Sequence, residues 1–374
     1  MSVMKARIRI RVKVLQNNKK IKECLCLTSC FLSFTNFPWN SIIISMWMPT
    51  LRLRKKMKKL FLTLCLAPSI LMLASCVSHV LKVEQQEMYS LYYVPFRQSQ
   101  SLAHLDSEAT LKFSNDDNLP VIDGATALFP VYCSFAEAVY PSDCNVEYFI
   151  RFSGTNWAYE KLMSGEDDII FVAEPSKEQK EMAKERGVEF NMYPIGCEAF
   201  VFIVNARNPV ESLILQQIKD IYSGKITSWR KVGGKWKKIR PFQRARNSGS
   251  QTAFVKMMGK DFDLIPPETH KKLTFMDGII DVVSDYENHD NAIGYTFRYF
   301  LRNMNKNPGV KMLNINGVEP SLENIKNKTY PLADNFYAVT IKGKESENTK
   351  KLIKWILSDE GQELIKKVGY VPVK

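Results

Sequence analysis

The sequence predicts an exported α/β protein, and three observations support this class. From Leu119 to the C-terminus, short apolar segments typical of strands alternate with amphipathic segments typical of helices. Upstream, a lysine cluster precedes an apolar stretch, as in a secretory signal. The chain has 374 residues, of which 45% are hydrophobic and 24% charged. This is an ordinary globular composition, and the length suffices for a substantial core.

The net charge of +13 belongs to the first 75 residues. They hold 14 Lys and Arg and one acidic residue, Glu23, whereas residues 76–374 hold 38 residues of each sign. A basic folded body would indicate nucleic acid or an anionic membrane as its partner, but this body is neutral. We therefore expect no nucleic-acid partner.

The basic leader ends in a lipoprotein-type signal. Four lysines around Met57 precede an apolar run over 60–73, which is too short to span a bilayer of about 30 Å. The following Leu-Ala-Ser-Cys resembles the lipobox of bacterial lipoproteins, in which the cysteine is lipidated. Residues 57–75 are therefore predicted to be a signal peptide, and Cys76 a lipid anchor that holds the protein on a periplasm-facing membrane surface. The alternative is an uncleaved anchor helix.

The segments on either side of this signal are not expected to fold. Residues 1–56 precede a complete signal, and we interpret them as a non-native upstream extension, with Met57 as the true start. Residues 76–117 comprise the lipidated cysteine and a polar, aperiodic stretch that is predicted to be a flexible tether.

Three cysteines remain in the body, and their spacing leaves open whether Cys133 and Cys144 form a disulfide. The sequence has no C-x-x-C pair and only four dispersed histidines, so no metal site is expected.

The body is expected to contain nine strands and at least seven helices, enough for two α/β lobes. The strands are expected at 119–122, 147–152, 168–172, 189–194, 199–205, 239–243, 292–296, 310–315 and 336–340. The helices are expected at 129–139, 156–163, 177–185, 213–222, 251–258, 278–286 and 348–368.

Three polar turns each lie between a strand and a helix, at 123–126, 152–155 and 244–250. A helix N-terminus presents unpaired N–H groups and about half a positive charge, so hydroxyl or guanidinium groups beside it favour anion binding. A single turn of this kind is more often a simple helix cap. The turns therefore predict an anion site only if they converge.

The turns resemble motifs of the phosphate-binding proteins of bacterial phosphate ABC transporters. Five segments resemble that family's motifs in the same order: Gly124-Ala125-Thr126 with Phe129-Pro130, Gly154-Thr155, Ile218–Trp229, Arg244 with Ser248-Gly249-Ser250, and Asn291–Tyr295. The resemblance covers about residues 119–374. It implies a type II periplasmic-binding-protein fold, in which two α/β lobes joined by a hinge close an interlobe cleft on one oxyanion. Lobe I would comprise 118–204 and 296–374, and lobe II 205–295.

The resemblance also implies which groups contact phosphate. The first turn would contribute the Thr126 hydroxyl and the Ala127 N–H, and the second turn the Thr155 hydroxyl. The third turn would contribute a bidentate guanidinium together with hydroxyl and N–H donors, from Arg244, Ser248, Gly249 and Ser250. Neither a cofactor nor a catalytic residue is implied.

The sequence departs from the family at the residue that accepts the proton of bound phosphate. The family has an aspartate there, whereas alignment without gaps on Asp168 and Pro175 places Ala173 at this position and Glu174 next to it. A carboxylate accepts a proton from phosphate and repels a fully ionised oxyanion. Its absence leaves open whether the ligand is phosphate or another tetrahedral oxyanion.

Residues 230–246 form the densest basic stretch of the body, with eight Lys and Arg. We interpret them as a solvated loop and edge strand, with steering of anions toward the cleft as the alternative. Trp229 and Trp236 are predicted to be packing residues.

The predicted function is that of a monomeric, lipid-anchored solute-binding protein that captures inorganic phosphate and delivers it to an ABC-transporter permease, without catalysis. One alternative is a phosphatase-like enzyme with Ser248 or Ser250 as nucleophile, although no histidine or carboxylate spacing indicates a general base or a metal pair. The other is a periplasmic sensor or scaffold that binds another tetrahedral oxyanion.

Overall fold

The structure is a computed structural model of the chain, and it describes residues 102–115, 117–259, 263–266, 279–280, 283–284 and 290–374. The predicted upstream extension, signal peptide and Cys76 lie outside the described residues, as does most of the predicted helix 278–286. Within the described ranges, no helix combines the length and apolar character that a membrane span requires.

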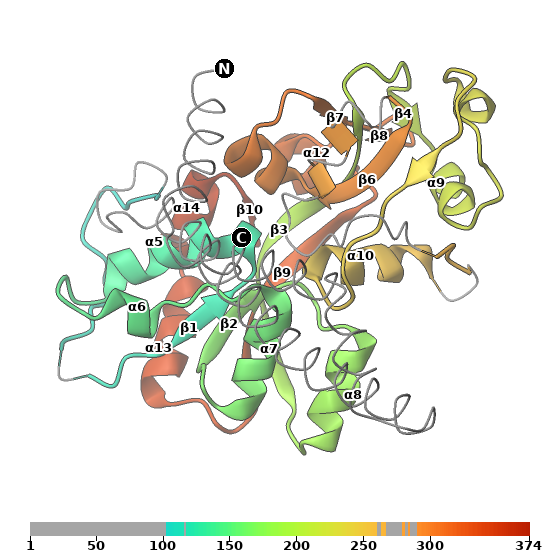
Figure 1. Ribbon diagram of the computed structural model, residues 1–374. Coiled ribbons are helices and arrows are strands. Elements are labelled where there is room, and N and C mark those ends of the chain that lie inside the picture. Colours follow the sequence, from blue (N-terminus) through green and yellow to red (C-terminus); the bar gives the residue numbers. More distant parts are fainter. Residues whose placement is uncertain (1–101, 116, 260–262, 267–278, 281–282, 285–289) are drawn as a thin grey trace, which may run out of the picture. The chain divides into compact units, whose positions relative to one another are not determined.

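A mixed sheet forms the centre of the described domain (Figure 1). Its strand order is β1-β2-β9-β3-β6-β5, and β7 and β10 also pair with β3. The parallel pairs are β1 with β2 and β5 with β6, and the other pairs are antiparallel. The strands are β1 (Ile122–Gly124), β2 (Ile169–Val172), β3 (Phe190–Asn205), β5 (Arg240–Pro241), β6 (Ala292–Phe297), β7 (Val310–Met312), β9 (Ala333–Ile341) and β10 (Val371–Pro372).

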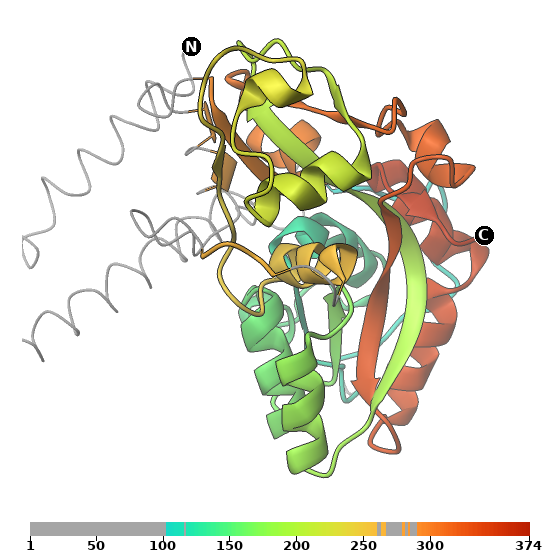
Figure 2. The same ribbon diagram turned by 90° about the vertical axis from the view of Figure 1, so that its right-hand side faces the viewer.

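The long strand β3 joins the two halves of this sheet. Its residues up to Ala199 pair with β9, and its last residues pair with β6 and β7. Figure 2 shows β3 and β9 running side by side along the domain. The prediction of two separate strands at 189–194 and 199–205 was wrong, because a bulge between Pro194 and Gly196 lets the strand continue.

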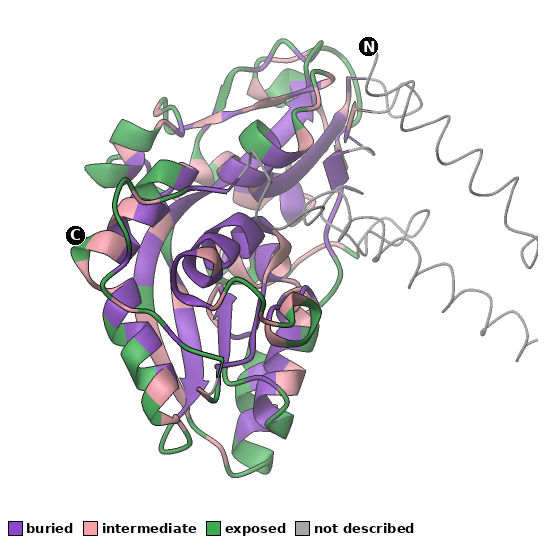
Figure 3. Ribbon diagram, turned by 90° about the vertical axis from the view of Figure 1, so that its left-hand side faces the viewer, coloured by how far each residue is buried: buried purple, intermediate pink, exposed green. Residues whose placement is uncertain are grey.

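Helices cover both faces of the half-sheet that contains β1, β2 and β9. In Figure 3 the strands between these helices are coloured as buried. Alternate residues of β2 point to opposite faces. Ile170 and Val172 pack with α7, whereas Phe171 stacks on Tyr132 of α5. The longer helices are α5 (Phe129–Val139), α7 (Thr155–Ser164), α8 (Lys177–Glu185), α9 (Leu215–Tyr222), α10 (Gly249–Met258), α13 (Glu347–Ile356) and α14 (Asp359–Val368).

The short elements complete the described domain. They are the 3₁₀ helices η2 (Thr126–Leu128) and η3 (Trp229–Val232), the π-helical turn η5 (Phe300–Asn305), the short helices α6 (Val146–Phe149) and α12 (Leu322–Lys326), and the parallel strand pair β4 (Ser212–Leu213) and β8 (Asn314–Ile315).

The predicted helices 129–139 and 177–185 are confirmed end to end as α5 and α8. The predicted strand 147–152 is wrong, because the Asn145 side chain accepts a hydrogen bond from the Tyr148 N–H and starts the helix α6 there. The single helix predicted over 348–368 divides into α13 and α14, and Ser358 is the N-cap of α14.

Packing of the described domain begins before residue 118. Leu102, Ala103 and Phe113 are buried, although they belong to the segment predicted as a tether. The Ala103 N–H donates to Ser134 Oγ at 3.0 Å, and the Phe113 N–H donates to the Val139 carbonyl at 2.8 Å. In this described part of the chain, the three body cysteines form no disulfide.

Candidate anion-binding site

The first turn leaves β1 and enters η2. The Ala125 N–H donates to the Phe171 carbonyl of β2 at 2.8 Å. Thr126 is half-buried and Ala127 is buried, and the Ala127 carbonyl accepts from the Tyr370 hydroxyl at 2.5 Å. The turn is therefore held from both sides, by β2 and by a tyrosine from the C-terminal end of the chain.

Asp123 ties the first turn to the second. This fully buried carboxylate accepts from the Gly124 N–H at 2.7 Å and from the Ser153 N–H at 2.8 Å. The Gly154 N–H also donates to the Gly124 carbonyl at 3.1 Å. Burial raises the pKa of Asp123, although these hydrogen bonds and the nearby Lys161 ammonium oppose the shift. The two turns thus form one hydrogen-bonded unit.

Thr155 is the first residue of α7 and is only 8% exposed. The preceding Gly154 has a φ of 78°, a left-handed conformation that costs glycine little. As the N-cap residue of α7, Gly154 contributes no side-chain cap. The first N–H groups of α7 therefore add a positive end of the helix dipole beside the Thr155 hydroxyl.

The third turn places a buried arginine beside the start of α10. Arg244 is 7% exposed, and its Nε donates a long hydrogen bond of 3.4 Å to Ser250 Oγ. Its backbone N–H donates to the Tyr295 hydroxyl at 2.9 Å, which fixes the main chain. Ser248 is the N-cap of α10, and its hydroxyl oxygen accepts from the Gln251 N–H at 3.2 Å.

The second and third turns converge at Gly249. A Cβ atom at Gly249 would lie 3.0 Å from Thr155 Oγ1 and 3.8 Å from the Ala173 side chain. The Ser176 hydroxyl donates to Asn247 Oδ1 at 2.9 Å and connects the third turn to the N-cap of α8. The N-termini of α7 and α10 therefore meet at van der Waals distance, although they are far apart in the sequence.

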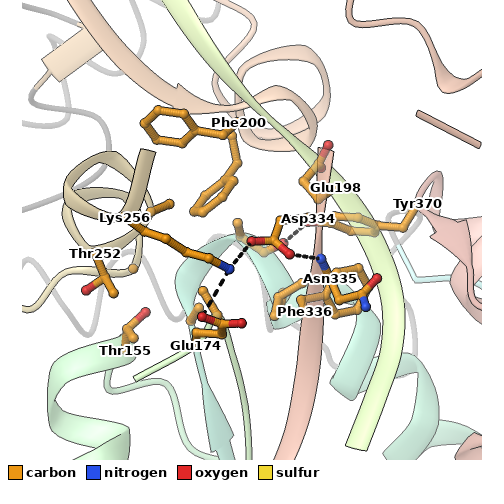
Figure 4. Close-up of a pocket in the computed structure, with 17 residues that line it drawn as sticks. Thr155, Glu174, Glu198, Phe200, Thr252, Lys256, Asp334, Asn335, Phe336 and Tyr370 are labelled. Carbon is orange, nitrogen blue, oxygen red and sulfur yellow. Dashed lines mark hydrogen bonds and ion pairs between the residues drawn. The ribbon is translucent and has the colours of Figure 1, made fainter. Parts of the chain in front are cut away.

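A cavity of about 60 Å³ adjoins this meeting point (Figure 4). Of the predicted site residues, Ala127, Thr155 and Gly249 line it, whereas Thr126, Arg244, Ser248 and Ser250 are not part of its lining. The rest of the lining is mostly apolar, with small and aromatic side chains that include Ala125, Ala173, Ala253, Phe200, Phe297, Phe336 and Tyr370.

Lys256 borders the cavity and was not predicted as a site residue. Its ammonium lies 2.7 Å from an Asp334 oxygen and 3.1 Å from a Glu174 oxygen (Figure 4). It thereby connects α10 with β9 and with the loop after β2. Helical spacing could have identified it, because positions 249, 252, 253 and 256 of α10 share one face, and all four line the cavity.

Glu198 also lines the cavity. Its carboxylate accepts from the Ala199 N–H at 2.7 Å and from the Tyr299 N–H at 3.0 Å, which connects β3 to the segment after β6. Burial raises the pKa of Glu198 to about 7, and these hydrogen bonds and the Arg298 charge only partly offset this effect.

One of the two tryptophans in and beside the basic stretch 230–246 does not pack as predicted. Trp229 is 1% exposed and packs as predicted, but Trp236 is 79% exposed, with the Arg230 guanidinium 3.7 Å from the centre of its ring. The side chain is stabilised by this cation–π contact instead of a core. Lys235 and Lys237 both form ion pairs with Asp290.

The family model of the PBP superfamily domain matches residues 115–360, well over half of the chain. The chain belongs to the PBP superfamily. This membership confirms the family resemblance deduced from the five motifs. The predicted type II periplasmic-binding-protein fold, with two α/β lobes and an interlobe cleft, is confirmed as well.

Two curated proteins are similar to this chain over most of its folded body. The chain is 27% identical over 267 residues to Protein SphX of Synechococcus elongatus, which covers 68% of this chain and 77% of that protein. It is 26% identical over 249 residues to the phosphate-binding protein PstS of Staphylococcus saprophyticus, with 64% of this chain and 76% of the relative covered.

Two solved structures extend the comparison. A putative phosphate ABC transporter substrate-binding protein with bound phosphate, from Clostridium perfringens, is 28% identical at a TM-score of 0.55, and the match covers 69% of this chain and 100% of that one. An ABC-type phosphate transport receptor from Vibrio cholerae is 22% identical at a TM-score of 0.51, with 67% and 99% covered. The second likeness supports the fold alone.

Proposed function

We propose that this protein is an exported, lipid-anchored solute-binding protein that captures inorganic phosphate and delivers it to an ABC-transporter permease. The observation that carries the proposal is the meeting of the α7 and α10 N-termini at Thr155 and Gly249, beside the buried Arg244. The names of the relatives from S. saprophyticus and C. perfringens, which refer to phosphate, support it.

The chemistry of these turns suits a desolvated oxyanion. Phosphate leaves water only if its oxygens find donors in the protein. In this proposal the Thr126 hydroxyl and the Ala127 N–H donate from the first turn and Thr155 from the second. Hydroxyl and N–H groups of the third turn donate from the opposite side, from Ser248, Gly249 and Ser250. Arg244 and the two helix dipoles supply positive charge.

Discrimination among oxyanions is expected to be weak. Ala173 cannot accept a proton from the ligand, and the next residue, Glu174, is paired with Lys256 and accepts from the Tyr337 hydroxyl at 3.4 Å. We expect sulfate and molybdate to compete with phosphate more effectively than they would at a site that holds a carboxylate. A thermal-shift panel with phosphate, arsenate, sulfate and molybdate measures this directly.

The proposed lobes keep the bounds that the family resemblance implies, although β8 of lobe I pairs with β4 of lobe II. Residues 118–204 with 296–374 would form lobe I, and 205–295 lobe II, and ligand would favour the closed arrangement of the two. Cys76 would hold the monomer on a periplasm-facing membrane surface, and the part of the predicted tether 76–117 that precedes the packed residue Leu102 would connect it to the folded domain.

Catalysis by Ser248 or Ser250 is the less favoured alternative. A serine nucleophile needs a base that removes its proton. In the described structure, Ser248 Oγ accepts from a backbone N–H, and the neighbour of Ser250 is the Arg244 guanidinium, which stays charged and only donates. We therefore propose binding without turnover.

Calorimetric titration of the purified full chain with phosphate tests the proposal. Binding should be lost or weakened by about 100-fold in Arg244→Ala, because a buried charge-assisted pair is costly to leave incomplete. Arg246→Ala is the matched control, since this side chain is exposed two residues away, and should change affinity by less than about threefold. Absence of phosphate binding to the wild type would refute the function. Equal affinity of the two variants would move the anion site elsewhere.

A further inference from the structure

The cavity beside Thr155 and Gly249 has a lining that an inorganic oxyanion does not need. A volume of about 60 Å³ accommodates roughly four atoms of water size, given about 10–15 Å³ for each. Alanine and aromatic residues account for eight of the 17 residues that line the cavity. Phosphate oxygens need hydrogen-bond donors, which alanine and aromatic side chains without a polar group do not offer. The lining residues that belong to the proposed anion site are Ala127, Thr155 and Gly249, so the apolar residues form a separate part of the wall.

Small residues create this space on one side of the cavity. Ala125, Ala173 and Ala253 come from three different segments, and Gly249 has no side chain. Phe200, Phe297 and Phe336 form much of the remaining wall. An empty apolar cavity lowers stability, whereas an apolar group that enters it gains transfer free energy.

We propose that the cleft also binds a phosphoryl dianion that carries a short alkyl group, as in an alkylphosphonate or an alkyl phosphate monoester. The phosphoryl oxygens occupy the three turns, and the alkyl group enters the cavity. This inference rests on the proposed function, because it uses the same anion site. It adds a second subsite and a substrate class to that site.

The ion pairs of Lys256 limit the size of the substituent. The cavity lining includes Lys256, Glu174 and Asp334. The Lys256 ammonium lies 2.7 Å from an Asp334 oxygen and 3.1 Å from a Glu174 oxygen. A group of two or three carbons fits within the apolar part, whereas a longer chain has to separate these charges. Affinity should therefore fall steeply beyond three carbons.

Competition calorimetry with phosphate, ethylphosphonate and hexylphosphonate on the purified full chain provides the test. Ethylphosphonate should bind within about tenfold of phosphate, and hexylphosphonate at least about tenfold more weakly than ethylphosphonate. Ethyl phosphate, the monoester, should behave as ethylphosphonate does. Binding of phosphate without measurable binding of ethylphosphonate would overturn the subsite and leave the proposed function intact. Failure of all these ligands to bind would refute both.

A cavity-filling variant separates the subsite from the anion site. Ala253→Phe should lower the affinity for ethylphosphonate by about tenfold or more and change that for phosphate by less than about threefold. If Ala253→Phe disturbs folding, Ala253→Val adds less volume and replaces it in the test. This variant should also weaken the binding of ethylphosphonate more than that of phosphate. Val255→Phe on the exposed side of α10 is the control and should alter neither affinity. Equal losses for both ligands in both Ala253 variants would contradict a separate alkyl subsite.

Discussion

At the scale of single residues, Gly249 is where the third turn packs against Thr155 of the second turn. The space there is tight for a methyl group, because an added Cβ would lie 3.0 Å from Thr155 Oγ1. We expect Gly249→Ala to separate the two helix N-termini by a few tenths of an ångström and to lower phosphate affinity by about tenfold. Titration calorimetry measures this loss. A melting temperature of the ligand-free variant close to that of the wild type would show that the fold is intact, and unchanged affinity would contradict the role of this contact.

Asp123 acts at the same scale, through the backbone of the first and second turns. Asp123→Ala removes the acceptor of the Gly124 and Ser153 N–H groups, so the free energy of unfolding should fall by about 2–4 kcal/mol. Urea denaturation measures the change. Asp123→Asn keeps one acceptor oxygen and should be clearly less destabilising. A loss below about 0.5 kcal/mol in the alanine variant would refute this role.

At the scale of elements, the division between α13 and α14 depends on Gly361. A Cβ atom there would lie 2.3 Å from the Ile356 carbonyl oxygen, so an alanine requires the two helices to shift. We expect Gly361→Ala to lower the free energy of unfolding by about 1–3 kcal/mol. Lys366→Ala, at an exposed position of α14, should change it by less than about 0.5 kcal/mol in the same denaturation assay. Equal stabilities of the two variants would refute the packing argument.

The ion pairs of Lys256 connect α10 to β9 and to the loop after β2. Because the side chain is half exposed, Lys256→Met should change the free energy of unfolding by no more than about 1 kcal/mol. Phosphate affinity should fall about two- to fivefold, since these contacts hold α10, which begins at the proposed anion site, against β9 and the loop after β2. Raised salt should weaken binding less in the variant than in the wild type. A wild-type salt dependence in Lys256→Met would contradict the prediction.

At the scale of the whole molecule, two buried carboxyl groups govern stability between pH 5 and 8. Burial raises the pKa of Glu198 to about 7, and burial together with the nearby Asp123 raises that of Asp167 to about 7. In the unfolded chain the pKa of each of these two groups is near 4. The stabilisation that they contribute to the folded state is therefore complete below pH 4 and is lost as the pH rises through 7. The free energy of unfolding should therefore be higher at pH 5 than at pH 8. In Glu198→Gln this difference should shrink, as urea denaturation at a series of pH values would measure.

Much of the local structure was predictable from the sequence. Helices 129–139 and 177–185 follow from apolar spacing and from a capping box at Ser176, and the three turns follow from small and hydroxyl residues between strands and helices. The errors have local causes too. Asn145 caps a short helix where a strand was expected, and the bulge at Gly196 continues a strand across an apparent break.

The sequence by itself determined the order of the elements and the residues of each turn, because caps, spacing and turn chemistry act over a few neighbouring positions. It could not determine the contact of Gly249 with Thr155, the ion pairs of Lys256 or the apolar cavity between them. These features join segments that are distant along the chain. Only the packing of α7, α10, β3 and β9 sets the distances between them, and packing depends on all the side chains of the core together.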